Sequence, residues 1–313
     1  MNRESVFVTG ISGSVGHYLF DYLSEREDIE LYLLVRNARK LKFQYKDKPQ
    51  VQIIFSDMEN IDKYADLLEQ MNYVIHLAAS WGGPSVYDVN VDKTLKMFSY
   101  LNPQRLKKVI YFSTASILEN DGSLSLAALR WGTDYIRSKY QCFSRLSGVP
   151  IHDKICTFFP TVLLGGDHCH PPTHASLELN KLWKYLPLLR FFKIDGSFHF
   201  IHAGSVARMI DYCLYNSCPQ NKYILGNSPL TVDECLRQLC EIAGIKRSFG
   251  LDMTKLLAKF LPVILRGKMS SWDRYALSRR SFRFDTVNAK TFGLKPYREA
   301  LKECLPDDLE LRP

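Results

Sequence analysis

A glycine-rich turn near the start of the chain is the feature that most constrains its fold. The apolar run Val6–Val8 predicts a buried strand, and apolar residues at near-helical spacing from Val15 to Leu23 predict a helix. Gly10, Gly13 and Gly16 form the turn between them. This order presents helix N-terminal N–H groups to an anion, and the helix dipole favours a phosphate there. An ordinary strand–helix turn is the alternative interpretation.

Each glycine of this turn has its own role in a dinucleotide-binding fold. Gly10 permits the tight turn, Gly13 lets a pyrophosphate approach the backbone, and Gly16 lets the helix pack closely on the strand. The spacing is Gly-x-x-Gly-x-x-Gly rather than the common Gly-x-Gly-x-x-Gly. The residues of the turn that we expect to bind the cofactor are Gly10, Ser12, Gly13, Ser14, Val15 and Gly16.

Length and charge narrow the class of protein. A chain of 313 residues can bury a large core, as one long α/β domain or as two interlocked ones. The formal net charge of +8 suits an anionic ligand such as a phosphorylated cofactor, and could also suit nucleic acid or an acidic membrane surface. The chain carries no recognisable nucleic-acid-binding motif, so we expect a small-molecule substrate and no nucleic acid partner.

Three observations lead us to expect a cytoplasmic protein that does not associate with membranes. The first predicted strand begins almost at Met1, so we expect no signal peptide. The sequence contains no run of about 18 apolar residues, so we expect no membrane-spanning helix. The eight cysteines form no C-x-x-C pair, and Cys213, Cys235 and Cys240 fall in apolar helix-like patterns. We expect these to be reduced core thiols rather than disulfides or zinc ligands.

A basic residue follows the second predicted strand, Ile29–Val35. Arg36 stands where NAD-binding chains carry an acidic residue for the ribose hydroxyls. An arginine there would instead pair with a 2′-phosphate, and Arg39 and Lys40 stand close behind it. We therefore expect NADP, with NAD as a possible cofactor. The alternative is a solvated basic loop.

Two further strands are predicted at Val51–Phe55 and Tyr73–Leu77. Asp57, which follows the first of them, could cap the helical segment that begins near Ile61. His76 lies inside an apolar strand, so we expect a hydrogen-bonded core histidine rather than a base.

A tyrosine and a lysine lie four residues apart on a helix predicted after the fifth strand, Lys107–Phe112. Tyr135 and Lys139 therefore share one face of that helix. A phenol has a pKa of about 10, and an adjacent ammonium favours the phenolate and lowers that pKa, as general acid–base catalysis requires. The hydroxyl of Thr114, just after the strand, could hold the substrate oxygen. An incidental pair on a helix is the alternative.

These motifs resemble the extended short-chain dehydrogenase/reductase family, also called the NAD-dependent epimerase/dehydratase family. The resemblance covers nearly all of the chain. The segments that carry it are TGISGSVG, VIHLAAS, VNVDKT, VIYFSTAS, YIRSK, FFPTVLLGG, FHFIHAGSVARMI, YILGN and FDTVNAKTFGLKPY. It implies an α/β fold, a doubly wound parallel Rossmann sheet with a smaller C-terminal substrate domain.

The resemblance also implies roles for individual residues. Thr114 would orient the substrate oxygen, Tyr135 would exchange a proton with it, and Lys139 would hold the nicotinamide ribose and depress the tyrosine pKa. Members of the family often form homodimers. The other positions expected to contact or support the cofactor site are Asp57 and Met58 at the adenine, Ala78, Ala79 and Ser80 at the ribose, Asn90, and Pro160, Thr161 and Val162 at the nicotinamide.

The same resemblance divides the chain. Residues 1–165 would form the dinucleotide-binding domain, with residues 198–225 returning to it. Residues 166–197 and 226–313 would form the substrate-binding domain. Two features remain open in this part of the chain: the loop with His168, His170 and His174, and the apolar segment 253–268. We expect no metal at the former; the latter is either a core-facing helix pair or an interfacial or lid segment.

Departures from the family pattern limit the range of reactions that we expect. Ala115 and Ser116 stand where sugar dehydratases carry Asp-Glu, which disfavours a dehydratase. Leu118 and Phe159 replace a common Tyr and Arg, which points to a less polar substrate. We therefore expect an NADP-dependent enzyme that interconverts a carbonyl and a secondary alcohol. A nucleotide-sugar epimerase and a non-catalytic NADP sensor or scaffold are the alternatives.

Overall fold

A seven-stranded parallel sheet forms the centre of the computed structural model, which describes residues 3–248, 250–252 and 269–305. The strand order is β11-β6-β5-β4-β1-β2-β3. Two of the strands, β2 and β3, have the predicted bounds. The strands are β1 (Glu4–Thr9), β2 (Ile29–Val35), β3 (Val51–Phe55), β4 (Tyr73–His76), β5 (Lys108–Phe112), β6 (Ile155–Pro160) and β11 (Lys222–Leu225).

The order of the strands reverses beside β1. From β1 the chain proceeds outward through β2 and β3, and then returns to the other side of β1 as β4. The register pairs Thr9 with both Leu34 and His76, so the segments after β1, β2 and β4 leave the same edge. In such sheets ligands bind outside the carboxyl ends of the strands at this reversal. The predicted doubly wound α/β fold is confirmed.

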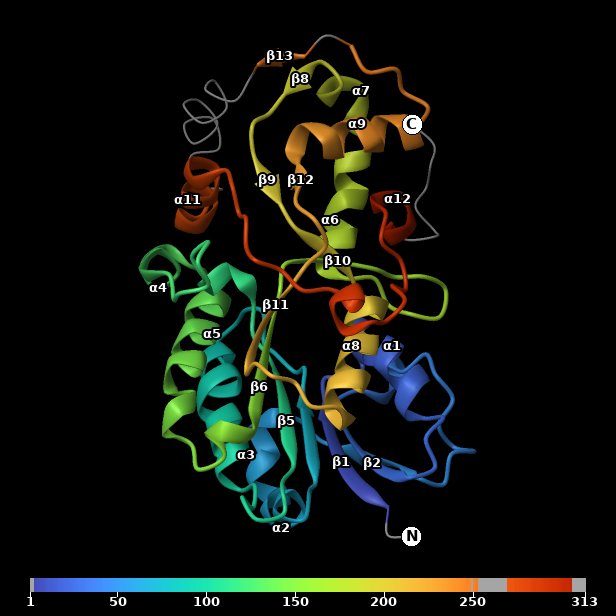
Figure 1. The fold of residues 1–313 in the computed structure, drawn as a ribbon, viewed down its shortest axis with the longest axis vertical. Coiled ribbons are helices and arrows are strands. Elements are labelled where there is room, and N and C mark those ends of the chain that lie inside the picture. Colours follow the sequence, from blue (N-terminus) through green and yellow to red (C-terminus); the bar gives the residue numbers. More distant parts are fainter. Residues whose placement is uncertain (1–2, 249, 253–268, 306–313) are drawn as a thin grey trace.

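Helices cover both faces of the sheet (Figure 1). One face carries α1 and α8, which pack against each other, and the other carries α3 and α5. The helices of this part are α1 (Ser14–Leu23), α2 (Ala65–Glu69), α3 (Thr94–Ser99), α4 (Leu126–Trp131), α5 (Asp134–Arg145) and α8 (Ala203–Tyr215). The short helical turns are η1 (Ala38–Lys40), η2 (Met58–Tyr64), η3 (Asp88–Lys93), η4 (Ala115–Ile117), η5 (Leu146–Gly148) and η6 (His152–Lys154).

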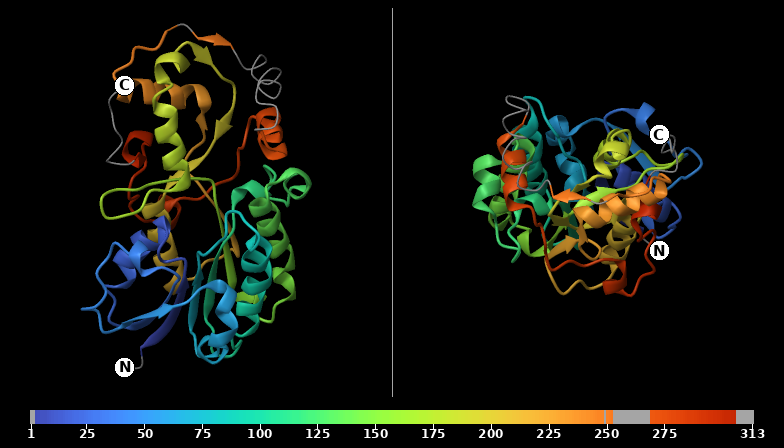
Figure 2. Two further views of the ribbon diagram at one scale, coloured as in Figure 1. Left: turned by 180° about the vertical axis from the view of Figure 1, so that it is seen from behind. Right: turned by 90° about the horizontal axis from the view of Figure 1, so that it is seen from above.

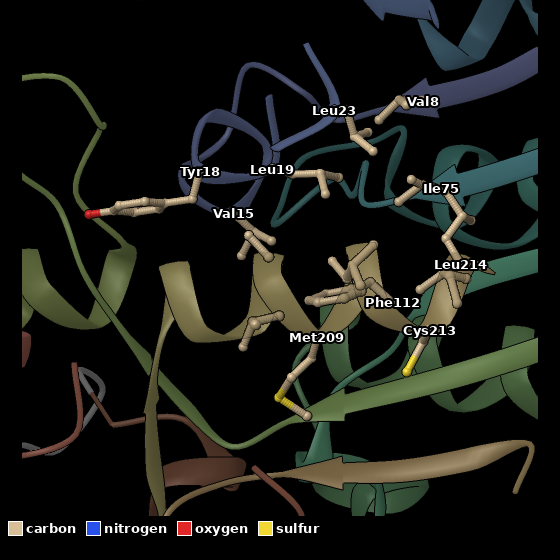
Figure 3. Packing of buried hydrophobic residues seen from close by; sticks show 14 of the residues in the cluster. Val8, Val15, Tyr18, Leu19, Leu23, Ile75, Phe112, Met209, Cys213 and Leu214 are labelled. Atoms are coloured by element: carbon tan, nitrogen blue, oxygen red, sulfur yellow. The ribbon is translucent and has the colours of Figure 1, made fainter. Parts of the chain in front are cut away.

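The strands alternate their side chains between two cores, as a sheet buried on both faces requires. Val6 and Val8 join the core beneath α1 and α8, whereas Phe7 between them joins the core on the opposite face. Figure 3 shows the first of these cores, where Leu19 of α1 and Met209 of α8 lie over the sheet. Cys213 is fully buried there, and Cys235 and Cys240 are buried in a further core, as predicted.

A smaller region lies beyond the carboxyl ends of the strands (Figures 1 and 2). Its core is formed by α6, α7, α9 and α12 with residues such as Trp183 and Leu236. Its elements are β7 (Val162–Leu164), α6 (His174–Trp183), α7 (Leu186–Leu189), β8 (Phe192–Lys193), β9 (Ser197–Phe198), β10 (Phe200–His202), β12 (Leu230–Thr231), α9 (Val232–Ile242), β13 (Leu251–Asp252), α11 (Ser271–Arg279) and α12 (Leu301–Cys304). The short turn η7 (Ala289–Phe292) instead belongs to the core of α1 and α8.

No helix within the described ranges has the length and apolar character needed to cross a bilayer. The apolar segment 253–268 lies outside the described residues, so both interpretations of it stay predictions.

Candidate active site

The glycine turn has the close contacts that its proposed role requires. Gly10 has φ +76°, and a Cβ there would lie 2.5 Å from the backbone nitrogen of Ala78. A Cβ on Gly16 would lie 2.3 Å from the carbonyl oxygen of Ile11, so α1 can pack this closely against the turn only with a glycine. Gly13 precedes the first residue of α1, and its N–H donates to the Gly10 carbonyl at 3.0 Å. No side chain of the described residues caps the first N–H groups of α1, so these groups can bind a phosphate.

Ser14 adds an unpartnered polar group at the same place. Its Oγ is buried and has no hydrogen-bond partner among the described residues. A buried hydroxyl without a partner costs free energy, and a phosphate oxygen at the N-terminus of α1 would satisfy it. Ser12 is half-buried in the turn, and the Val15 side chain faces the core, which leaves its backbone N–H for an anion. These residues fit the pyrophosphate of a dinucleotide.

Three cations lie at the carboxyl end of β2. Arg36, Arg39 and Lys40 are exposed, and no ion pair to a carboxylate holds any of them within the part of the chain that is described. Because β2 lies beside β1, Arg36 and Gly10 leave adjacent strands at one edge. The position is the one predicted for a 2′-phosphate partner.

Asp57 caps a helical turn, as one interpretation of the sequence predicted. Its Oδ1 accepts hydrogen bonds from the backbone N–H of Asn60 at 3.2 Å and from the Asn60 side chain at 2.9 Å. Met58 is buried against the core. Contact of either residue with an adenine stays a prediction.

Asn90 ties the loop after β4 to the helix that carries Tyr135. Its side chain accepts from the Ser80 N–H at 2.8 Å and donates to the Ser80 carbonyl at 2.8 Å. It also donates to Ser138 Oγ at 2.9 Å, and Ser138 donates to the Tyr135 carbonyl at 2.8 Å. Asn90 lies in η3, a π-helical turn, a conformation frequent at functional sites. Its predicted supporting position is consistent with this network.

Tyr135 and Lys139 lie one turn apart on α5, above the carboxyl end of β5. Lys139 is 2% exposed, and its ammonium donates to the carbonyl of Phe112, the last residue of β5, at 2.7 Å. Thr114 follows that strand end, and its Oγ1 accepts from the Ser116 N–H at 3.2 Å. The three predicted residues are thus gathered at one strand end, but no hydrogen bond joins their side chains to one another in the described ranges.

The pKa values of this pair correct one expectation. Burial raises the pKa of the Tyr135 phenol above its ordinary value, and burial lowers the pKa of the Lys139 ammonium to about 8. Neither residue contributes to the shift of the other. The expected lowering of the Tyr135 pKa by Lys139 is therefore wrong for this arrangement, because burial dominates the pKa of the phenol and the ammonium faces a backbone carbonyl.

His76 is the hydrogen-bonded core histidine that the sequence predicted. Thr9 Oγ1 lies 2.7 Å from its Nδ1 and Thr94 Oγ1 lies 2.9 Å from its Nε2. Burial lowers its pKa well below the ordinary value, so the ring is neutral.

The segment expected at the nicotinamide crosses from β6 into β7. Thr161 donates from its N–H and from Oγ1 to the carbonyl of Leu225, at 3.0 and 2.8 Å. Val162 is more than one-third exposed, and Pro160 ends β6. Ala78 and Ala79 are half-buried in the loop after β4. Their contacts with a cofactor stay predictions.

The histidine loop links the smaller region to α1. His170 stacks on Tyr18 with ring centroids 3.7 Å apart, and its Nδ1 and Nε2 lie 2.7 Å from Asp167 and 2.8 Å from Asp21. Burial disfavours the charged ring, but the two carboxylates outweigh it and raise the pKa of His170. Tyr18, whose hydroxyl points away from the core in Figure 3, donates to Asp167 at 3.0 Å. Sequence analysis did not predict this network.

The same loop brings possible metal ligands together. Ligand atoms of Asp167, His168 and Cys169 lie within 4.8 Å of one another. Both carboxylate oxygens of Asp167 already accept hydrogen bonds from Tyr18 and from the loop itself. The expectation that no metal binds here stays a prediction.

Two of the departures noted in the sequence lie in a buried core beside α5. Leu118 is buried in a small core with Ile136. Phe159 belongs to the same core and packs edge-on against Phe143, with ring centroids 5.0 Å apart. The inference of a less polar substrate from these two positions stays a prediction.

Sequence reasoning also missed Trp81. The indole is 66% exposed and lies parallel to the Tyr135 ring, with centroids 4.2 Å apart. The signal that could have found it is its position directly after the predicted cofactor residues Ala78–Ser80, at the carboxyl end of a central strand.

The strand order reverses beside the glycine turn, and a tyrosine–lysine pair lies at the carboxyl end of β5. This arrangement defines a Rossmann-type dinucleotide-binding protein. Residues 6–144 match the model of the NAD dependent epimerase/dehydratase family. The family recognised from the motifs is therefore confirmed over that segment. No curated protein matches the sequence significantly.

Solved structures share the fold over nearly the whole chain. The crystal structure of gox2253 is 20% identical with a TM-score of 0.73, and 96% of each chain is covered. A UDP-N-acetylglucosamine 4-epimerase from Methanobrevibacter ruminantium M1 is 17% identical with a TM-score of 0.67, covering 99% of this chain and 98% of that one. The dTDP-glucose 4,6-dehydratase from Bacillus anthracis str. Ames, in complex with NAD, is 14% identical with a TM-score of 0.64, covering 98% and 96%.

Proposed function

We propose that the protein is an NADP(H)-dependent oxidoreductase that interconverts a carbonyl and a secondary alcohol. The observation that carries this proposal is the placement of Tyr135 and Lys139 one turn apart on α5, with the lysine fully buried at the end of β5. A buried ammonium is costly, and chains keep one where it is used. This placement supports an enzyme over a non-catalytic NADP sensor or scaffold.

Different residues of the candidate site would bind the cofactor and act on the substrate. The bare backbone at Gly13 and the Ser14 hydroxyl would bind the pyrophosphate, and Lys139 would bind hydroxyls of the nicotinamide ribose. Bound there, the nicotinamide supplies the hydride chemistry. Tyr135 would exchange its phenolic proton with the substrate oxygen, and Thr114 would orient that oxygen.

The preference for NADP rests on Arg36 and its neighbours. Exposed guanidinium groups that have no carboxylate partner among the described residues suit a 2′-phosphate beside the glycine turn, whereas an acidic residue at this position would repel it. Solved structures with this fold hold NAD in several cases, as in the dehydratase from Bacillus anthracis. The two cofactors therefore need a direct comparison.

The cofactor test is a titration of the purified protein with NADPH and with NADH. We expect tighter binding of NADPH, and a selective loss of that advantage in Arg36→Ala. Arg145→Ala, which removes an equally exposed cation far along α5, is the matched control and should bind both cofactors as the native protein does. Equal or reversed affinities of the native protein for the two cofactors would refute the assignment of Arg36.

The chemical test compares the native protein with Tyr135→Phe. Hydride transfer from NADPH to a panel of ketones, followed by NADPH absorbance, should fall by about 10²–10⁴-fold in the variant. The affinity for NADPH should stay within about twofold, since the phenol is not a phosphate ligand. Undiminished transfer would remove Tyr135 from the mechanism.

A nucleotide-sugar epimerase is the second candidate, because proteins with this fold include the epimerase from Methanobrevibacter ruminantium. An epimerase returns the hydride to its substrate, so the cofactor stays bound and shows no net turnover. Incubation with UDP-sugars and analysis of the sugar configuration separates the two functions. Conversion of a UDP-sugar without net NADPH consumption would favour the epimerase.

A further inference from the structure

Trp81 lies against the ring of the proposed acid–base residue. The planes of Trp81 and Tyr135 differ by 16°, with centroids 4.2 Å apart. The imidazole of His174, at the start of α6, is also parallel to the indole, within 11° at 5.9 Å. Helix α5 and the smaller region beyond the sheet thus both contribute a ring that is parallel to this one side chain.

Hydrogen bonds to the preceding residue hold the backbone at Trp81 in place. Asn90 binds both backbone polar groups of Ser80, the residue before it, and reaches the carbonyl of Tyr135 through Ser138. After Trp81, a Cβ on Gly82 or Gly83 would meet no atom of the described residues within 4 Å. An anchored indole therefore borders open space.

The exposure of Trp81 has no structural explanation in the fold. Trp183, in the core of the smaller region, is only 6% exposed. Trp131 and Trp272 both lie against Tyr275, which joins α4 to α11. Trp81 instead leaves most of a large, rigid aromatic surface in water directly beside Tyr135, where it is available to a ligand.

We infer that Trp81 is a specificity residue for substrates in which a flat apolar group, such as an aromatic ring, is bonded to the reacting carbon. Aromatic faces stack on flat groups at the separations found here. A substrate oxygen at the Tyr135 hydroxyl would place its neighbouring group over the adjoining indole. The inference deepens the proposed function and rests on it for the role of Tyr135.

The test compares two alcohols that differ only in the flatness of one group. The protein, with and without NADP⁺, is titrated with 1-phenylethanol and with 1-cyclohexylethanol, and binding is followed by saturation-transfer NMR. We expect the phenyl compound to bind about 3- to 10-fold tighter, the range of an aromatic pair. Trp81→Ala should abolish this preference, and Trp81→Phe should keep most of it.

Matched variants make the outcome decisive. Trp131→Ala removes another exposed tryptophan, whose ring lies against Tyr275, and should leave the preference unchanged. Equal binding of the two alcohols, no binding of either, or a preference that survives Trp81→Ala would overturn the inference. A Trp81-dependent preference without hydride transfer to NADP⁺ from any alcohol would instead contradict the proposed function. It would still support the binding of flat apolar groups by Trp81.

Discussion

The turn after β1 and the loop after β4 leave neighbouring strands at the same edge of the sheet, and both contain glycines. In the first, a Cβ on Gly10 would lie 2.5 Å from Ala78 and one on Gly16 would lie 2.3 Å from Ile11. In the second, a Cβ on Gly82 or Gly83 would meet nothing within 4 Å in the part of the chain that the structure describes. The same residue type is thus required by contact in one loop and unconstrained by space in the other.

This difference suggests that the first loop binds the cofactor and that the second loop determines substrate specificity. A loop with no space for a side chain suits a ligand of fixed shape, as the pyrophosphate of a dinucleotide is. A loop that borders solvent can change its residues without disturbing the sheet, and binding specificity commonly varies in such loops. The following substitutions test the comparison, beginning with the largest expected effect.

Gly10→Ala should disrupt the fitted loop most. The new methyl group meets the backbone of Ala78, and φ +76° is unfavourable for alanine, so we expect a loss of about 3 kcal/mol or more in unfolding free energy. Urea unfolding measures this loss, and NADPH binding should disappear with it. Gly244→Ala shares the positive φ (+68°) but would meet no atom of the described residues, so it should cost only about 1–2 kcal/mol. Equal losses in the two variants would show that contact is not the cause.

Asn90→Ala should loosen the second loop at its base. It removes three hydrogen bonds of 2.8–2.9 Å and leaves the polar groups of Ser80 without this partner, at a cost of about 2–3 kcal/mol. The fluorescence of Trp81 should also change, because its anchor is lost. Asn60→Ala, which removes one side-chain bond to Asp57, is the control, with an expected cost below about 1 kcal/mol. A stable Asn90→Ala with native fluorescence would mean that the network does not position Trp81.

Lys139→Met should stabilise the protein while abolishing activity. The folded pKa of about 8 lies below the ordinary 10.5, so the penalty for the buried charge is fully present below pH 8 and is relieved as the pH rises toward 10.5. The gain in unfolding free energy near pH 7 is up to roughly 3 kcal/mol, less the lost bond to Phe112. Unfolding at pH 7 and pH 10 should show the advantage shrinking. Exposed Lys63→Met should show no such change, and a pH-independent difference would contradict the shifted pKa.

Gly82→Ala should have the smallest effect, within about 0.5 kcal/mol of the native protein, because open space surrounds the new methyl group. Thermal unfolding and NADPH titration should both match the native protein. A large loss of stability would break the comparison, since the loop after β4 would then be as constrained as the glycine turn.

Sequence reasoning was most successful where one residue type satisfies a backbone requirement. The glycine turn, strands β2 and β3 and the core histidine His76 follow from local pattern, because burial and steric fit act over a few neighbouring residues. The Tyr135–Lys139 spacing similarly places both on α5.

The remaining features depend on contacts between segments that are distant in the sequence. His170 meets Asp21 across about 150 positions, and no local pattern indicates that pairing. The direction of the Tyr135 pKa depends on how deeply α5 is buried, which spacing cannot show. Trp81 looks like any loop tryptophan until the ring of Tyr135 is found beside it.

The packing of α8 against α1 bears on how the chain folds during synthesis. Val15, Leu19 and Leu23 share a core with residues 203–214, and β11 completes the sheet beside β6 only at Leu225. While the ribosome is still adding residues 24–202, the apolar side of α1 has no α8 to cover it. Because a nascent chain buries such surface only when its partner has emerged, the sheet and its first helix reach their final form late, after about two-thirds of the protein has been made.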